Sequence, residues 1–198
     1  RIPLPSFQAH RLMVDTFLRR SGLGVAKPLI ALHPGAGWPT KRWGEEKYAR
    51  LGDALALRTG AQVIITWGPG DEGVASRVRA LMSSEARLTP ALTLPQLACL
   101  LEHCIMFIGG DTGPLHLAAA MGVPVLGIYG PTTPWRNGPF GVEHAVLYRP
   151  LPCSGCHKRS CEDPICILSL TVQEALEAAL ELWGRVRERW RGRRVLEG

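Results

Sequence analysis

The segment Gly109–Pro124 has the residue types of an anion-binding turn. An apolar run typical of a buried strand ends in two glycines, and Thr112, Gly113 and Pro114 are typical of the start of a helix. Because the first N–H groups of a helix have no partner within it, we expect the amides from Thr112 to Leu115 to face a phosphate. Any turn from a strand to a helix favours such residues, so the segment alone also fits a structural role.

Two side chains in this turn can contact the same ligand. Asp111 repels a phosphate, so it either caps the helix or accepts hydrogen bonds from sugar hydroxyls. His116 either reaches the ligand or is a buried structural histidine. The chain shows no evident arrangement of nucleophile, base and acid.

Two further loops carry groups suited to a nucleotide. Thr40 and Lys41 follow a run of small residues, and both can donate hydrogen bonds to phosphate oxygens, with Lys41 the best cation for a diphosphate. Lys41 as a solvated surface lysine is the alternative. Glu72 follows a Gly-Pro-Gly turn, where its carboxylate can accept hydrogen bonds from both ribose hydroxyls or simply favour the helix dipole. For Asp71 we prefer the dipole explanation.

The elements that position these loops alternate between strands and helices. Strands are predicted at 29–33, 62–66, 105–108 and 125–129, and helices at 10–21, 45–58, 72–82, 95–102, 114–121 and 171–189. This alternation implies parallel strands joined by helices, and strands apolar on consecutive residues are covered on both faces. We therefore predict an α/β fold with a Rossmann-like, doubly wound parallel sheet. Ligands bind such sheets at the carboxyl ends of the strands, so four loops should share one edge: 33–43, 67–72, 109–114 and 130–135.

Composition suits one such domain. The chain has 198 residues, of which 46% are hydrophobic and 20% charged, and no apolar run is long enough to cross a bilayer. No signal peptide is visible, and the absence of an initiator Met suggests a piece of a longer chain. We expect a linker or helix at 1–24, the ligand-binding domain at 25–170 with a cysteine-rich loop at 151–167, and a helix with a basic tail at 171–198.

The net charge of +6 is concentrated near the C-terminus. This tail either contacts an anionic surface or is a solvated helix end, and the second interpretation is favoured because cations suit a helix C-terminus. Nucleic-acid binding is not expected. The arginines of the tail are Arg185, Arg187, Arg189, Arg191, Arg193 and Arg194.

Four strings in fixed order carry a family resemblance. They are His33-Pro34-Gly35-Ala36, Pro39-Thr40-Lys41-Arg42-Trp43, Gly68-Pro69-Gly70-Asp71-Glu72, and Gly109–Ala120 followed by Gly130-Pro131-Thr132. In this order and spacing, they resemble the C-terminal half of ADP-heptose:lipopolysaccharide heptosyltransferases, glycosyltransferase family 9. The resemblance covers about residues 28–190, and the Asp-Thr-Gly-Pro-x-His turn is its most distinctive part.

The resemblance implies the donor-binding half of a two-domain GT-B glycosyltransferase. Lys41 resembles the lysine that contacts the diphosphate, Glu72 the glutamate that binds the ribose, and Asp111 the aspartate that contacts the heptose. The implied donor-binding residues are Thr40, Lys41, Glu72, Asp111, Thr112, Gly113, Pro114 and His116.

The implied reaction transfers heptose from ADP-heptose to the lipopolysaccharide inner core. It is inverting, needs no metal or other cofactor, and takes place in the cytoplasm, with peripheral contact to the inner membrane surface as an option. The family's N-terminal domain, which binds the acceptor and supplies the catalytic base, has no counterpart in these residues. We therefore expect no catalytic residue in this chain, and no transfer by this chain alone.

Two other functions compete with this one. The chain could be a nucleotide-sugar-binding protein or an epimerase-like domain without transferase activity. A dehydrogenase domain is disfavoured because the loop after the first strand, Pro34–Trp38, lacks the Gly-x-Gly-x-x-Gly pattern.

A cluster of cysteines is not required by sugar transfer. Cys153, Cys156, Cys161 and Cys166 follow the pattern Cys-x2-Cys-x4-Cys-x4-Cys, which could close around zinc, with His157 as a fifth candidate ligand. The spacing is not that of two standard zinc knuckles, and similar stretches occur in the family that the chain resembles. A structural loop with thiols or a disulfide is favoured over zinc. The remaining cysteines, Cys99 and Cys104, are expected in the core.

Overall fold

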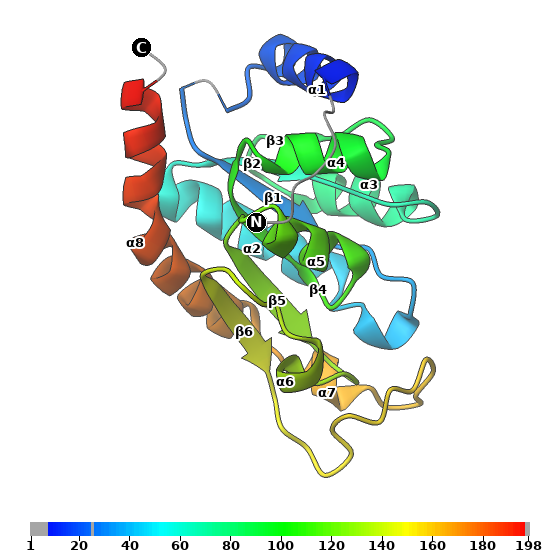
Figure 1. Cartoon of the computed structure of the whole chain (residues 1–198). Helices are drawn as coiled ribbons and strands as arrows, with labels where there is room; N and C mark the ends of the chain where they lie inside the picture. The colour runs from blue at the N-terminus through cyan, green and yellow to red at the C-terminus, as the bar shows by residue number, and fades with distance from the viewer. Residues whose placement is uncertain (1–7, 25, 197–198) are drawn as a thin grey trace.

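A parallel sheet forms the centre of the molecule. The computed structural model describes residues 8–24 and 26–196, with side chains as far as residue 188. The six strands lie in the order β3-β2-β1-β4-β5-β6, and neighbouring strands are parallel throughout (Figure 1). The strands are β1 (Leu29–His33), β2 (Gln62–Ile65), β3 (Ala86–Leu88), β4 (Cys104–Gly110), β5 (Val125–Tyr129) and β6 (His144–Tyr148).

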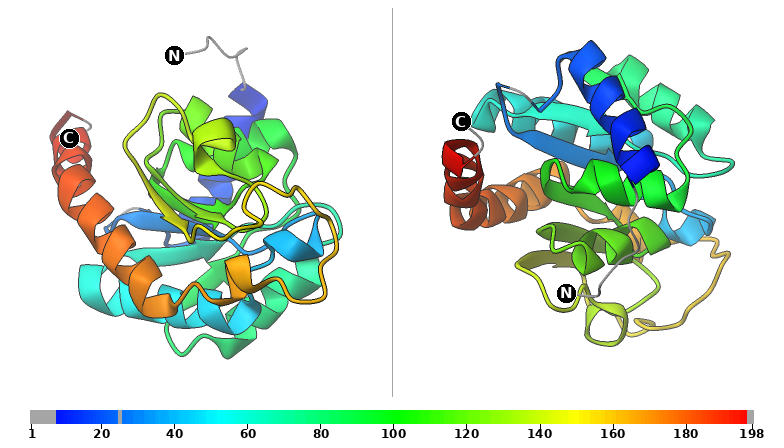
Figure 2. Two further views of the ribbon diagram at one scale, coloured as in Figure 1. Left: turned by 90° about the horizontal axis from the view of Figure 1, so that it is seen from below. Right: turned by 45° about the horizontal axis from the view of Figure 1, so that its top comes forward.

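Helices cover both faces of this sheet, as the consecutive apolar residues of the strands predict. Helices α2, α3 and α8 cover one face of the sheet and α1, α4 and α5 cover the other (Figure 2). Each set of helices shares a hydrophobic core with the face that it covers. Within β1, Ile30 and Leu32 belong to the first core, while Leu29 and Ala31 belong to the second. The predicted doubly wound fold is therefore confirmed. The helices are α1 (Gln8–Ser21), η1 (Pro39–Lys41), α2 (Glu45–Thr59), α3 (Glu72–Leu81), α4 (Leu94–Leu101), α5 (Gly113–Ala120), α6 (Pro134–Asn137), α7 (Ile165–Leu168) and α8 (Val172–Leu196).

The sequence did not predict several short elements. The two outer strands of the sheet are β3, which has three residues, and β6, which is only partly buried, so neither shows a clear apolar pattern. The single turns η1, α6 and α7 are too short for a helical period to appear. These elements matter because η1 and α6 each supply a residue to the site described below.

The terminal helices pack on the domain itself. α1 lies along α4, where Arg11 pairs with Glu102. α8 packs on α2 and β6 and buries one side, including Leu182 and Val186. None of the helices among the described residues is long and apolar enough to cross a membrane.

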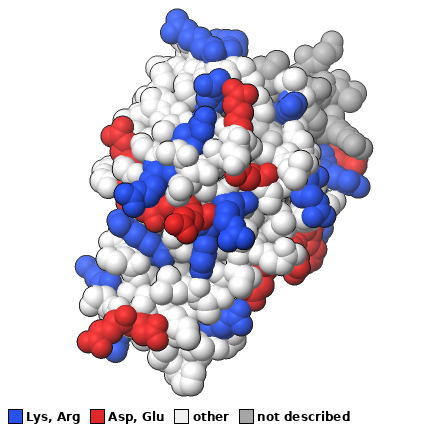
Figure 3. Space-filling view, turned by 180° about the vertical axis from the view of Figure 1, so that it is seen from behind, with Lys and Arg blue, Asp and Glu red and all other residues white. Residues whose placement is uncertain are grey.

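Two arginines of the basic tail, Arg185 and Arg187, lie near acidic side chains. Arg185 pairs with Glu181 at 2.7 Å and lies 3.6 Å from Glu143, and Arg187 pairs with Glu188. The side chains of Arg189, Arg191, Arg193 and Arg194 lie outside the described residues, as do residues 1–7. On the face shown in Figure 3, acidic and basic side chains are interspersed rather than gathered by sign.

Candidate functional site

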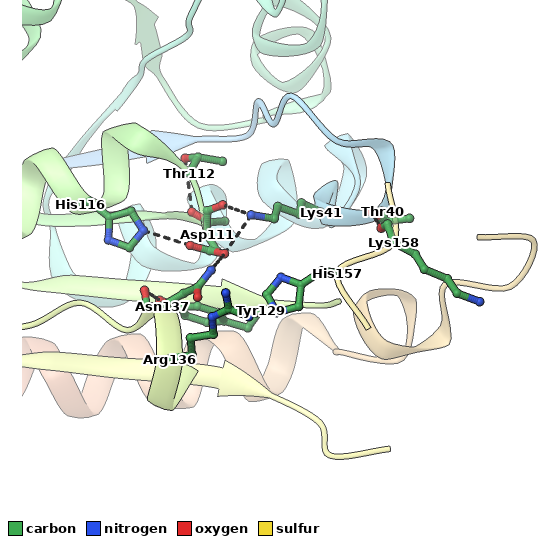
Figure 4. Close-up of polar contacts among 11 residues, drawn as sticks. Thr40, Lys41, Asp111, Thr112, His116, Tyr129, Arg136, Asn137, His157 and Lys158 are labelled. Atoms are coloured by element: carbon green, nitrogen blue, oxygen red, sulfur yellow. Dashed lines mark hydrogen bonds and ion pairs between the residues drawn. The ribbon is translucent and has the colours of Figure 1, made fainter. Parts of the chain in front are cut away.

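A polar cluster lies where the strand order reverses, between β1 and β4. From β1 the sheet grows through β2 and β3, and from β4 it grows through β5 and β6, so the loops after β1 and β4 diverge and leave room for a ligand. Lys41 from the first loop and Asp111 from the second meet here. The Lys41 Nζ donates to Asp111 Oδ2 and to the Asp111 carbonyl oxygen, both at 2.8 Å (Figure 4).

Asp111 is the centre of this cluster. Its side chain is 3% exposed and also accepts hydrogen bonds from His116 Nε2 and Asn137 Nδ2, each at 3.0 Å. Burial alone raises the pKa of the Asp111 carboxyl, but the hydrogen bonds from His116, Lys41 and Asn137 outweigh burial and hold that pKa well below its usual range. Asp111 is therefore ionised at neutral pH and is a weak base, which suits binding rather than proton abstraction.

Lys41 is held in place by the short turn η1. Its side chain is 13% exposed, and Nζ lies 4.5 Å from the centroid of the Trp38 ring. An ammonium group has three N–H donors, and Asp111 takes two of them. One N–H of Lys41 thus remains for a ligand.

Thr40 borders the site but its hydroxyl is already engaged. The side chain is buried, and Oγ1 donates to the Lys158 carbonyl oxygen at 2.7 Å. Thr40 thereby fixes the loop after β6 against the loop after β1. The Lys158 side chain points away from the Asp111 cluster in Figure 4.

The start of α5 departs from the expected pattern of amides. The Leu115 N–H is bonded to the Thr112 carbonyl oxygen at 3.1 Å, and Pro114 has no N–H. The amides that can face a ligand are therefore those of Thr112 and Gly113, fewer than the sequence led us to expect. Thr112 occupies the N-cap position without a capping hydrogen bond from its side chain, and the Gly113 Cα lies beside open space.

Glu72 lies apart from the cluster. It begins α3 after the loop that follows β2, and its side chain is exposed. Among the described residues it forms no hydrogen bond or ion pair with the residues around Asp111, so its assignment to the ribose stays a prediction. The preceding Asp71 pairs with Arg42 at 3.2 Å and lies against Gly35, in addition to its place at the helix start.

The loop after β5 was predicted at this edge, but the sequence did not identify Asn137 in α6 as a residue of the site. Nothing in the sequence around Asn137 indicates that its side-chain amide would contact Asp111. The Asn137 carbonyl oxygen accepts a hydrogen bond from Tyr129, and Arg136 donates to His157 Nε2 at 3.1 Å. The hydroxyl of Thr132 is buried and helps to lower the pKa of the Asp111 carboxyl.

The cysteine-rich loop lies beside this edge. All six cysteines belong to the described residues and none forms a disulfide, and Cys99 and Cys104 are buried in the core as expected. Burial raises the pKa of the Cys166 thiol, and the charges of Cys153, Cys156 and Cys161 raise it further. Over the described residues, no three His, Cys, Asp or Glu side chains are already arranged around a metal.

The fold and the cluster at its switch point define a Rossmann-like α/β domain of the type found in GT-B glycosyltransferases. Residues 6–165 match the model of glycosyltransferase family 9 (heptosyltransferase), and the chain belongs to this family.

Known proteins of similar sequence and structure agree with this assignment. Lipopolysaccharide heptosyltransferase 1 of Pseudomonas aeruginosa is 32% identical over 189 residues, which cover 84% of this chain and 53% of that protein. The structure of a family 9 glycosyl transferase from Veillonella parvula has a TM-score of 0.78 at 25% identity, covering 88% of this chain and 51% of that one. The E. coli ADP-heptose lps heptosyltransferase II has a TM-score of 0.74 at 23% identity, covering 92% and 53%. The chain thus spans about half the length of these proteins.

Proposed function

We propose that this chain is the donor-binding domain of a heptosyltransferase that transfers heptose from ADP-heptose to the lipopolysaccharide inner core. The observation that carries this proposal is the buried Lys41–Asp111 cluster at the switch point of the sheet. The names of the family and of its relatives support the choice of heptose and lipopolysaccharide.

The diphosphate of the donor lies, in this proposal, at the start of α5. Asp111 offsets much of the charge of Lys41, so Lys41 serves by the direction of its remaining N–H as much as by its charge. The amides of Thr112 and Gly113 add donors at the positive end of a helix. Arg136, whose partner among the described residues is a histidine nitrogen, supplies a cation that no carboxylate offsets.

The heptose lies between the diphosphate and the Asp111 cluster. An ionised carboxylate accepts hydrogen bonds from sugar hydroxyls, and His116 and Thr132 can exchange further hydrogen bonds beside it. Asp111, which is unfavourable beside a phosphate alone, is suited to a sugar whose phosphate is held by neighbouring groups.

The chemical step is an inverting displacement in this proposal. A base removes the proton from the acceptor hydroxyl, the oxygen attacks the anomeric carbon, and ADP leaves with the bonding electrons. The low pKa of Asp111 makes it a poor candidate for that base. We assign the base and the acceptor site to the part of the full-length enzyme beyond this chain, and charge stabilisation of the leaving ADP to Lys41 and the start of α5, without a metal.

The proposed partners follow from this reaction. The enzyme takes ADP-heptose and a lipopolysaccharide core acceptor, acts in the cytoplasm at the inner membrane surface, and does not bind nucleic acid. Glu72 binds the ribose of the donor if the adenosine extends from the switch point toward the loop after β2.

Calorimetry with ADP and UDP tests the donor site. We expect ADP to bind, and the Lys41→Ala and Asp111→Ala variants to bind it at least roughly tenfold more weakly, a loss of about 1.4 kcal/mol or more. Arg185→Ala, on the far edge of the sheet, is the control and keeps the wild-type affinity. Unchanged affinity in both site variants, or equal preference for UDP, contradicts the proposal.

A further inference from the structure

Two cationic side chains lie against one aromatic ring at the carboxyl ends of the strands. The Lys41 Nζ lies 4.5 Å from the centroid of the Trp38 ring, and the Arg159 Cζ lies 5.0 Å from the same centroid. Trp38 and Lys41 belong to the loop after β1, whereas Arg159 belongs to the loop that joins β6 to α7. The Trp38 ring therefore holds a second cation beside the Lys41–Asp111 cluster.

The turn η1 brings Lys41 onto this ring. The Lys41 N–H donates to the Trp38 carbonyl oxygen at 3.0 Å and closes a 3-10 turn. Side chains three residues apart in such a turn lie one above the other. The face of an indole ring also attracts a cation. Trp38 and Asp111 thus both hold the Lys41 ammonium in place.

Arg159 reaches the ring because the residues before it are held at this edge. No side chain of the loop 149–164 is buried, so polar contacts position the loop. The Lys158 carbonyl oxygen accepts from Thr40 Oγ1 at 2.7 Å, and the His157 N–H donates to the Pro131 carbonyl oxygen at 3.1 Å. The hydrogen bond from Thr40 to Lys158 joins the two residues that directly precede the two cations in the chain.

Arg159 has a positive charge that no carboxylate offsets. Lys41 donates twice to Asp111, whereas Arg159 is exposed and forms no ion pair among the described residues. Two cations at one ring repel each other, and an anion that binds both of them offsets this repulsion. A guanidinium can also donate two parallel N–H groups to a phosphate. The pair of cations therefore suits an anion with two charged groups, such as a diphosphate.

We propose that Arg159 is a second cation of the diphosphate site, and that Trp38 positions Arg159 together with Lys41. This inference rests on the proposed function, because the diphosphate is that of the ADP-sugar donor. In the transfer step, the bond between the anomeric carbon and the diphosphate oxygen breaks, and the oxygen keeps the bonding electrons. Arg159 offsets the negative charge that develops on the diphosphate and stays protonated throughout.

Calorimetry with ADP and rate measurements on the full-length enzyme test this assignment. Arg159→Ala should bind ADP roughly tenfold more weakly, because a hydrogen bond between charged groups is lost. The same variant should have a lower kcat, because the charge on the leaving ADP is no longer offset. Arg159→Lys should recover part of both losses, since it restores the charge without the paired N–H groups.

Lys158→Ala is the matched control. It removes one positive charge from the same loop, and the Lys158 side chain points away from the Asp111 cluster (Figure 4). The Lys158 carbonyl oxygen that accepts from Thr40 remains in this variant. We expect Lys158→Ala to keep the wild-type affinity for ADP.

Variants of Trp38 test the positioning of Arg159. Trp38→Leu should weaken ADP binding, and Trp38→Phe should keep most of the affinity, because a phenyl ring also attracts cations. In the Trp38→Leu background, Arg159→Ala should weaken binding less than it does in the wild type, because Arg159 is no longer held in place. An equal loss in both backgrounds would show that Trp38 does not position Arg159.

The outcomes separate this inference from the proposed function. If the wild type binds ADP and Arg159→Ala has the same affinity and kcat, Arg159 is not part of the site and the inference is wrong. An equal loss in Lys158→Ala and Arg159→Ala also overturns it, because the effect would then be one of overall charge. If the wild type does not bind ADP, the proposed function fails and this inference fails with it.

Discussion

The two edges of the sheet both carry charged residues, but they use them differently. At the amino edge, a hollow of about 690 Å³ is lined by Gly122, Gly141, Val142, Glu143, His144 and Arg185. Its ion pair, Arg185–Glu143, is 3.6 Å long and its side chains are 39% and 38% exposed. At the carboxyl edge, the Lys41–Asp111 pair is 2.8 Å long and its side chains are 13% and 3% exposed.

The two pairs differ in burial: protein encloses the pair at the carboxyl edge, whereas the pair at the amino edge is open to water. Water screens the exposed pair at the amino edge. A buried carboxylate is stable only with hydrogen-bond donors from the protein, and here the donors come from η1, α5 and α6. The Asp111 cluster is held by several elements at the switch point, which is why we propose the ligand site there, while the amino edge has the ordinary charge pattern of a protein surface.

The largest expected effect comes from removing the buried carboxylate. Asp111→Ala leaves the Lys41 ammonium mostly buried without a carboxylate to offset its charge, and should lower the free energy of unfolding by about 3 kcal/mol. Glu143→Ala at the amino edge should cost less than about 1 kcal/mol, because its pair is exposed. Urea denaturation of both variants measures this difference, and equal losses would remove the distinction between the edges.

Acid should also lower the stability of the folded protein through His33, which lies at the carboxyl edge as the last residue of β1. Burial lowers the pKa of His33 to about 4, from an ordinary value of 6.5. As the pH falls from 6.5 toward 4, His33 is protonated in the unfolded chain but stays neutral in the folded chain. The free energy of unfolding therefore falls over this range. We expect a loss of about 2 kcal/mol between pH 7 and pH 5 from this residue.

Denaturation at both pH values, with His33→Asn as the comparison, measures this contribution. The variant should lose stability less steeply, because the buried imidazole is gone. An identical pH dependence in the wild type and the variant would show that His33 is not the group responsible.

A smaller effect separates two glycines within one loop of the carboxyl edge. A Cβ on Gly35 would collide with the Asp71 carboxylate, which pairs with Arg42, while Gly37 lies beside open space. Gly35→Ala should therefore cost about 1–2 kcal/mol of stability, and Gly37→Ala less than about 0.5 kcal/mol. Thermal unfolding of the two variants measures these costs. An equal cost at Gly37 and Gly35 would contradict the close contact between Gly35 and Asp71.

The sequence predicted the sheet and the edge more reliably than the contacts within the edge. Strands such as β1 and β5 could be predicted because burial on both faces leaves a continuous apolar run. Parallel order then implied that the loops after β1 and β4 share an edge, which is how Lys41 and Asp111 could be expected near each other. The outer strands β3 and β6 were not predicted, because short or partly exposed strands lack a continuous apolar run.

The individual hydrogen bonds could not be predicted in this way. Asn137 and Asp111 are 26 residues apart, and Thr40 and Lys158 are 118 apart. Whether such side chains meet depends on turns of a few residues, namely α6 and η1, which leave no periodic trace. The engagement of Thr40 with the cysteine-rich loop is visible only in the folded chain.

A crystal structure with bound ADP tests the central claim most directly. The account predicts the diphosphate beside Lys41 and the amides of Thr112 and Gly113, with the adenosine extending toward Glu72. ADP bound in the amino-edge hollow beside Arg185, with the Lys41–Asp111 cluster unoccupied, would contradict the claim.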